Sequence, residues 1–303
     1  MNTAALIIAA GLPMYGSVPA AMFQVGAVST AQHMIASFEK AENTYIYLVT
    51  DEATKKLEKQ LSFTGTMFIR SEGTVLDCAK QAIVSLPRHY DRVLLCPCDR
   101  PMVMPQSITK MLSTNGDIVS ASYCGNESPF YLLSMEAAEA FCADTFCTDF
   151  PEAMSNLGYD KKTVELNEPG LFITPDKAVK NEELIKQHQS ALTRPVLDIS
   201  ISAEQTIFEL RLIKLMRLVN SLHSVRDACE MLGISYSIAW SLLNSAEEQL
   251  GYPIVRRNQG GRSGSGSVLT EKGQQLLEAY DTFESEIRLY SKGLFAEYFK
   301  GFF

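Results

Sequence analysis

No lysine or arginine precedes Lys40, so the first part of this 303-residue sequence has no cation of its own to offer an anionic ligand. Apolar runs also stay well short of the roughly 20 residues that cross a bilayer, and no basic segment precedes the short apolar stretch at the start. We therefore expect no membrane partner, no export and a cytoplasmic location.

Cysteine is present seven times, but without a C-x-x-C pair or nearby histidines. An odd count argues against a disulfide framework, and the spacing does not indicate zinc. We expect buried thiols in a reducing cytosol. Cys96 and Cys98, beside Asp99, are the pair to test for metal or redox chemistry.

A net charge of −8 argues against nucleic-acid binding until the chain is divided. Residues 1–192 contain 15 Lys and Arg against 22 Asp and Glu, whereas residues 193–303 contain 12 against 13. Within the second part Arg256, Arg257 and Arg262 cluster with no acidic residue between them. A local basic patch matters more for phosphate contact than the total charge.

Residues 4–185 alternate short apolar, β-rich runs with helical stretches, which is typical of βαβ units. We predict an α/β fold with a doubly wound, largely parallel sheet. The expected strands are 4–10, 44–50, 66–70, 92–98 and 117–123, and the expected helices are 29–41, 52–61, 73–86 and 105–113.

Composition changes at residues 187–195, where Pro195 disfavours helix at the residue before it. We place the boundary between domains 1–192 and 193–303 there. The second domain is expected to contain an extended piece (196–201), a long helix (204–222), two helices joined by a tight turn, a hairpin (253–257 and 267–270) and a final helix from 271 to about 299.

Residues 223–251 predict a helix-turn-helix, because Gly233 suits the left-handed end of one helix and Ser235 the N-cap of the next. In the second helix Ile238, Ala239, Leu242, Leu243, Ala246 and Leu250 form the expected core stripe. The opposite side would meet base edges or phosphates of double-stranded DNA. Its candidate DNA-binding residues are Ser235, Tyr236, Ser237, Trp240, Ser241 and Asn244.

The basic hairpin after this helix is typical of the wing of a winged helix-turn-helix, where Arg256, Arg257 and Arg262 would hold phosphates or reach the minor groove. Residues 233–280 resemble the DNA-binding domain of the LysR class and, more closely, that of the molybdate-responsive ModE-type regulators. The oxyanion-binding domain usual in that family does not follow, so the resemblance implies DNA binding as a homodimer without molybdate sensing. It rests on Gly233-Ile234-Ser235-Tyr236, Ala239-Trp240, Gly251-Tyr252-Pro253, residues 260–266 and Leu269-Thr270-Glu271-Lys272-Gly273.

The final helix supports the homodimer independently, because its apolar stripe runs on to an aromatic end. An exposed face of that length is expected to pack on a second copy, or else on the helix at 204–222. The stripe comprises Leu276, Leu277, Tyr280, Phe283, Ile287, Leu294, Phe295, Tyr298, Phe299, Phe302 and Phe303.

Two segments of the first domain, residues 6–11 with Gly16 and Gly26, and residues 94–101, resemble MobA-like nucleotidyltransferases of the molybdenum cofactor and cytidylyltransferase group. The resemblance implies a nucleotide-diphospho-sugar transferase-like fold, a first loop that cradles a triphosphate, and Asp99 as a ligand of Mg²⁺. Here, however, Tyr15 and Ala20 stand where that family has an arginine and a lysine, and nucleotidyl transfer depends on such cations.

The family's second metal-binding carboxylate is also replaced by an apolar residue at Ile173-Thr174-Pro175, unless Glu168 takes its place. We therefore name no catalytic residue, expect Mg²⁺ only if the domain is an active transferase, and expect a binding pocket for a less charged ligand. Its candidate lining is Gly11, Met14, Tyr15, Cys98 and Asp99, since open α/β sheets bind ligands at the carboxyl ends of their strands.

The leading hypothesis is a transcription regulator linked to molybdenum cofactor or related metabolism, with a degenerate transferase-like domain as sensor or scaffold. A nucleotide, a pterin or an oxyanion is the expected effector. The alternative is an active magnesium-dependent nucleotidyltransferase, for a molybdopterin or sugar phosphate, whose DNA-binding domain is autoregulatory. A third possibility, a winged helix used only for protein interaction, is disfavoured by the three arginines.

Overall fold

The computed structural model describes residues 2–41, 45–61, 66–258 and 266–302. The chain divides into two compact units, Met1–Thr193 and Arg194–Phe303. This division lies one residue beyond the boundary expected from composition.

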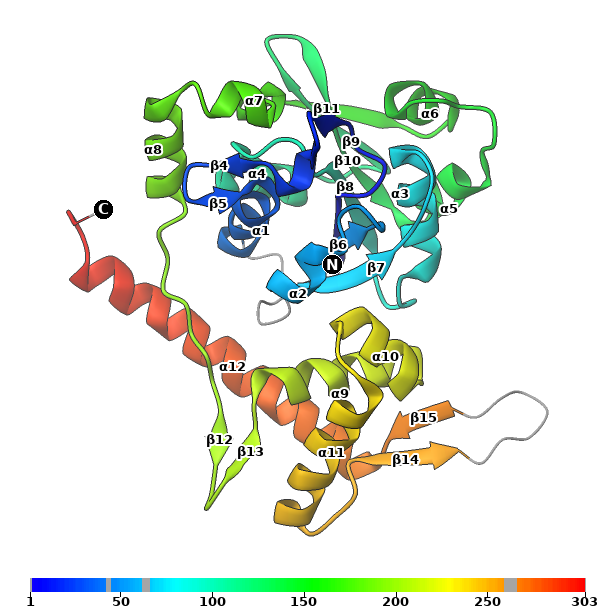
Figure 1. Cartoon of the computed structure of the whole chain (residues 1–303), viewed down its shortest axis with the longest axis vertical. Coiled ribbons are helices and arrows are strands. Elements are labelled where there is room, and N and C mark those ends of the chain that lie inside the picture. Colours follow the sequence, from blue (N-terminus) through cyan, green and yellow to red (C-terminus); the bar gives the residue numbers. More distant parts are fainter. Residues whose placement is uncertain (1, 42–44, 62–65, 259–265, 303) are drawn as a thin grey trace. The chain divides into compact units, whose positions relative to one another are not determined.

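The described residues of the first unit form a seven-stranded sheet in the order β11-β9-β10-β8-β1-β6-β7 (Figure 1). Only β10 runs antiparallel to its neighbours in this sheet, so the expected α/β fold with a largely parallel sheet is confirmed. The strands are β1 (Thr3–Ile8), β6 (Tyr45–Thr50), β7 (Met67–Arg70), β8 (Arg92–Pro97), β9 (Ile118–Tyr123), β10 (Asn126–Ser134) and β11 (Lys161–Glu165).

The central strand β1 is buried along its whole length, which explains its continuous apolar sequence. Ala5 and Ile7 lie in the core cluster shared with α1 and α4, and α3 packs against α5 and against β1, β6, β7 and β8. The helices are α1 (Thr30–Lys40), α2 (Lys56–Leu61), α3 (Val75–Ser85), α4 (Pro105–Ser113), α5 (Met135–Ala143), α6 (Phe150–Asn156), α7 (Pro175–Ala178) and α8 (Glu182–Ala191).

Several local features differ from the sequence prediction, and strand β11 is one that was not expected. The helix expected from residue 52 begins only at Lys56, because the Asp51 side chain accepts hydrogen bonds from the Thr54 amide and hydroxyl and holds a turn there. Strand β10 was not expected at all. It follows β9 through Cys124 and Gly125, which both have positive φ, as tight hairpins require.

The loop between β1 and α1 holds two small hairpins. They are formed by β2 (Met14–Tyr15) with β3 (Val18–Pro19) and by β4 (Gln24–Val25) with β5 (Val28–Ser29). Short 3₁₀ turns occupy Ala20–Met22 in this loop and Pro169–Phe172 after β11.

The second unit is mainly helical, with α9 (Leu210–Leu222), α10 (Val225–Leu232), α11 (Tyr236–Leu250) and α12 (Glu271–Tyr298). The helix expected from residue 204 was wrong at its start, because β12 (Ile201–Ser202) and β13 (Thr206–Phe208) form a hairpin there. The β-branched Thr206 and Ile207 favour that strand. A second hairpin pairs β14 (Val255–Asn258) with β15 (Gly266–Leu269) in antiparallel register.

Candidate functional site

The helix-turn-helix is built by local capping. Gly233 ends α10 with φ of 64°, and its amide donates to the Glu230 carbonyl oxygen. The Ser235 hydroxyl then accepts a hydrogen bond from the Ile238 amide at 3.3 Å and starts α11. The short turn therefore fixes the crossing of the two helices, and α11 occupies the position of a recognition helix.

The exposed face of α11 carries the candidate DNA-binding side chains. Ala239, Leu243 and Ala246 are buried, so the core stripe is narrower than expected. Ile238, predicted to be core, is 45% exposed beside Tyr236, which is 49% exposed. Trp240 is half-buried, and its ring meets that of Tyr236 edge-on at 6.0 Å. The other exposed candidates are Ser235, Ser237, Ser241 and Asn244.

The wing is fastened to the recognition helix by one carboxylate. Glu247 of α11 accepts hydrogen bonds from the backbone amides of Ile254, at 2.6 Å, and Val255, at 3.0 Å, through the same Oε1 atom. The other wing strand is tied to the end of α9, because the Ser267 amide donates to the His223 carbonyl oxygen at 2.9 Å. The hairpin therefore has a fixed base.

Two arginines of the wing, Arg256 and Arg257, belong to strand β14 of this hairpin. Arg256 is exposed on β14, opposite Val268. Arg257 pairs with Ser267 in the same hairpin, but its side chain lies outside the described residues, as does the whole of Arg262. The described part of the wing thus presents Arg256 close to the recognition helix's anchor at Val255.

The junction between wing and final helix explains a glycine in the Leu-Thr-Glu-Lys-Gly motif. The Thr270 hydroxyl caps α12 by accepting from the Gly273 amide and donates to the Pro253 carbonyl oxygen. A Cβ at Gly273 would lie 2.4 Å from the Ile254 carbonyl oxygen, so only glycine allows this approach. The motif therefore holds the wing against α12.

In the first unit, Gly11 and Asp99 follow β1 and β8 at the carboxyl edge of the sheet. Gly11 has φ of 68°, and a Cβ there would lie 2.6 Å from the Val75 amide nitrogen, so the loop packs tightly on the start of α3. Its amide donates to the Asp51 carboxylate at 3.1 Å. A backbone donor that could hold a phosphate is thus already bound to an anion of the protein.

Asp99 pairs with the residue that follows it. The Arg100 Nη1 atom lies 2.6 Å from Asp99 Oδ2 and also donates to the Asp99 carbonyl oxygen at 3.0 Å. Burial raises the pKa of Asp99 above its usual range, and the attraction of Arg100 only partly opposes this. The crevice therefore contains an arginine after all, but one that faces the carboxylate expected to bind metal.

Tyr15 is the candidate pocket residue most clearly associated with this pair. Burial raises the pKa of its hydroxyl, on which a hydrogen bond with Thr174 and the charges of Asp99, Asp176 and Arg100 also act. Met14 is 51% exposed in the same loop. Cys98 requires a correction, because its fully buried side chain belongs to the hydrophobic core and does not line an open crevice.

The carboxylate proposed as an alternative second metal ligand has a different role. Glu168 accepts a hydrogen bond from the Met104 amide at 3.1 Å and so caps the start of α4. Burial raises the pKa of Glu168, although hydrogen bonds from Ser107 and Met104 oppose the rise. Because Glu168 caps this helix through Oε1 and Asp99 faces Arg100 through Oδ2, each carboxylate keeps only one buried oxygen without a hydrogen-bond partner, which is a poor match to the two-carboxylate magnesium site of the transferases.

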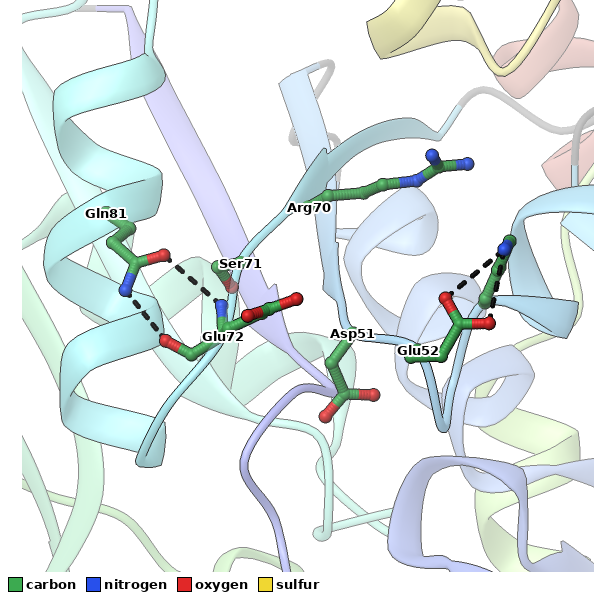
Figure 2. Close-up of a pocket in the computed structure, with 7 residues that line it drawn as sticks. Asp51, Glu52, Arg70, Ser71, Glu72 and Gln81 are labelled. Carbon is green, nitrogen blue, oxygen red and sulfur yellow. Dashed lines mark hydrogen bonds and ion pairs between the residues drawn. The ribbon is translucent and has the colours of Figure 1, made fainter.

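A polar cavity of about 480 Å³ opens beside the Gly11 loop, at the carboxyl ends of β6 and β7. Figure 2 shows the Asp51 carboxylate directed into it, between Glu52 and Glu72. The Gln81 side-chain amide accepts a hydrogen bond from the Glu72 backbone amide and donates one to the Glu72 carbonyl oxygen. Lys55 Nζ lies 3.2 Å from Glu52 Oε2. This lining suits a ligand rich in hydrogen-bond donors. It consists of Asp51, Glu52, Lys55, Arg70, Ser71, Glu72 and Gln81.

The cysteines do not line this cavity. Four cysteines are buried as expected: Cys78, Cys96, Cys98 and Cys229. The expectation was wrong for the other three, because Cys142 and Cys147 are only partly buried and Cys124 is exposed. Burial raises the pKa of Cys96 and Cys98 well above that of a free thiol.

No group of three or more His, Cys, Asp or Glu side chains in the described part of the chain is arranged to hold a metal ion. None of the described helices combines the length and apolar character needed to span a membrane.

Curated relatives match the C-terminal part of the chain. The transcriptional regulator ModE of Haemophilus influenzae is 29% identical over 87 residues, which are 28% of this chain and 34% of that protein. The DNA-binding transcriptional dual regulator ModE of Escherichia coli is 32% identical over 84 residues, 27% of this chain and 32% of that protein. The chain thus spans about a third of the length of these relatives. No family model matches it.

Solved structures match the sheet unit in fold alone. A nucleotidyl transferase from Methanothermobacter thermautotrophicus has a TM-score of 0.51 at 14% identity, with 63% of this chain and 97% of that one covered. The 4-diphosphocytidyl-2C-methyl-D-erythritol synthase of Anaerococcus prevotii has a TM-score of 0.50 at 13% identity, with 63% and 96% covered. This chain thus joins a unit similar in fold to nucleotidyltransferases to a C-terminal part similar in sequence to ModE regulators.

Proposed function

We propose that the protein is a cytoplasmic DNA-binding transcriptional regulator, linked to molybdenum cofactor or related metabolism, in which the nucleotidyltransferase-type unit is a sensor or scaffold. The observation that carries the proposal is the winged helix-turn-helix itself. Its recognition helix exposes Tyr236, Ser237 and Asn244, and its wing, anchored by Glu247, exposes Arg256. The partial likeness to ModE regulators supports the same function.

Double-stranded DNA is the proposed partner, bound by a homodimer. The first half of α12 packs within the chain, where Arg217 of α9 contacts Asp281 and Glu284, each at 2.6 Å. The second half of α12 and the end of the chain leave an apolar surface exposed, and a second copy would cover it. Its exposed members are Leu289, Tyr290, Tyr298, Phe299 and Phe302.

The effector is proposed to be a small molecule that binds at the carboxyl edge of the sheet. Nucleotides, pterins and oxyanions are the candidates. The polar cavity beside Gly11 supports this location best for a pterin, because its three carboxylates suit a ligand rich in hydrogen-bond donors and its Lys55 and Arg70 are paired with glutamates. Parallel sheets generally bind ligands at this edge.

A gel shift with a duplex from the region upstream of the protein's own reading frame tests DNA binding. Arg256→Ala combined with Arg257→Ala should abolish the shift at moderate salt. If each arginine holds a phosphate, the slope of log K against log salt should fall by about 0.9 per arginine. The control is Lys180→Ala with Lys186→Ala, which removes two exposed charges from the first unit. Equal binding by the two double variants would contradict the assignment of the wing.

The competing function is an active magnesium-dependent nucleotidyltransferase with an autoregulatory DNA-binding unit. The fold of the first unit and the position of Asp99 at the end of β8 favour it. With a phosphorylated acceptor such as a sugar phosphate present to take the nucleotidyl group, magnesium-dependent release of pyrophosphate from any of the four common triphosphates, lost in Asp99→Ala, would establish this function. The ion pair between Asp99 and Arg100 leads us to expect no such release.

A further inference from the structure

We propose that Arg100 is a built-in cation at the carboxyl edge of the sheet, where it takes the place of a divalent ion at Asp99. Arg100 belongs to the first unit and not to the winged helix. The carboxylates of that unit, Asp99 and Glu168, do not match the magnesium site that the fold implies.

The ion pair between Asp99 and Arg100 is enclosed. The side chain of Asp99 is 11% exposed and that of Arg100 is 18% exposed, with 2.6 Å between Nη1 and Oδ2. Exposed ion pairs contribute little because water screens them, but enclosed pairs are screened much less. An ion entering here would have to displace the guanidinium from Oδ2, or lie beside its positive charge.

The backbone around the pair is held from several sides. The Cys98 amide donates to the Ile8 carbonyl oxygen at 2.8 Å, which fixes the end of β8 against β1. The Val103 amide donates to the Arg100 carbonyl oxygen at 3.3 Å and closes a turn. A Cβ at Gly170 would lie 2.0 Å from the Met102 carbonyl oxygen, so the 3₁₀ turn after β11 presses on the same segment. The position of Arg100 is therefore set by the fold.

The Asp99 carboxylate is paired with a cation through Oδ2, whereas its Oδ1 atom is buried and has no hydrogen-bond partner. Mg²⁺ needs near-octahedral oxygen ligands and dehydrates reluctantly, so one paired carboxylate is a poor site. Glu168 caps α4, and the Gly11 amide is bound by Asp51. These groups therefore leave no net positive charge at this edge of the sheet for a further anion.

Binding of Mn²⁺ alone to the full chain, followed by electron paramagnetic resonance of the free ion, tests the proposal. The wild type should show no site that depends on Asp99. Arg100→Ala should gain one site, at least tenfold tighter than any Mn²⁺ binding by the wild type. Arg100→Ala combined with Asp99→Asn should lose that site again. Arg100→Lys, which keeps a cation, should behave as the wild type.

Two results would overturn the proposal. A Mn²⁺ site in the wild type that Asp99→Asn removes would show that Arg100 does not replace the ion. This comparison needs no variant of Arg100, so it decides the matter even if Arg100→Ala fails to fold. A folded Arg100→Ala, checked by circular dichroism, that binds Mn²⁺ no more tightly than the wild type would show that Arg100 is not what excludes the metal.

Discussion

Replacing Glu247 by alanine should loosen the wing from the recognition helix. The carboxylate accepts two backbone hydrogen bonds, from Ile254 and Val255, and both residues are buried. A hydrogen bond to a charged group contributes about 1.5–3 kcal/mol, and a buried amide left without a partner costs about 1–3 kcal/mol. Since the two bonds share one oxygen, we expect a loss of about 2–3 kcal/mol in the free energy of unfolding of the second unit.

For a unit of this size such a loss lowers the Tm by roughly 10 °C or more. Glu247→Gln keeps an oxygen acceptor without the charge and should lose only about 1 kcal/mol. DNA affinity should fall further than stability alone predicts, because Arg256 lies directly after the anchored Val255. Differential scanning calorimetry gives the first quantity, and fluorescence anisotropy with a labelled duplex, below the transition, gives the second.

Glu248→Ala is the matched control, since Glu248 is the exposed neighbour on the same helix. If Glu247→Ala unfolds at the same temperature as Glu248→Ala, the two hydrogen bonds do not hold the wing. If its stability falls while DNA binding stays at the wild-type level, the wing is not part of the DNA-binding surface.

Two further predictions concern the buried histidines and the final helix. Burial, and to a smaller extent the nearby His33, lowers the pKa of His188 to about 4. Because the unfolded chain then binds a proton that the folded chain excludes, the free energy of unfolding should fall by about 3 kcal/mol as the pH drops from 6.5 to 4. Urea midpoints measured across this pH range should show a smaller loss for His188→Gln. For the homodimer, light scattering should give twice 33.6 kDa for the wild type and 33.6 kDa for Tyr298→Glu combined with Phe302→Glu, whereas a monomeric wild type would contradict it.

The features predicted correctly from the sequence are those set by local chemistry. Gly233 and Ser235 determine the turn of the helix-turn-helix from their own conformational and capping preferences, and both act as expected. The continuous apolar run of β1 likewise predicted a buried parallel strand from local sequence alone, and β1 is buried along its whole length. Strand β10 was missed because its signal, an apolar run after the turn at Cys124 and Gly125, lies next to polar residues that resemble a loop.

Other features depend on contacts between distant residues, and sequence patterns do not encode them directly. Ile238 was placed in the core because its spacing fits the stripe, yet the packing of α11 uses only the narrower face of Ala239 and Leu243. That Glu168 caps α4 follows from a contact 64 residues away along the chain. The side chain of Arg100 could have pointed to solvent, and its turn onto Asp99 depends on burial that a spacing rule does not contain.

The two units differ in whether the groups that could bind a polyanion are already paired within the chain. In the sheet unit the groups that could meet a triphosphate already have partners in the chain, since the Gly11 amide is bound by Asp51, and Arg100 by Asp99. Breaking two charge-assisted contacts of about 1.5–3 kcal/mol each would weaken triphosphate binding by roughly 10²–10⁴-fold. In the winged helix Arg256 is exposed beside an exposed, polar recognition face, so phosphate contact there need not displace the anchor at Glu247. This difference favours DNA over a nucleoside triphosphate as the polyanion that the protein binds.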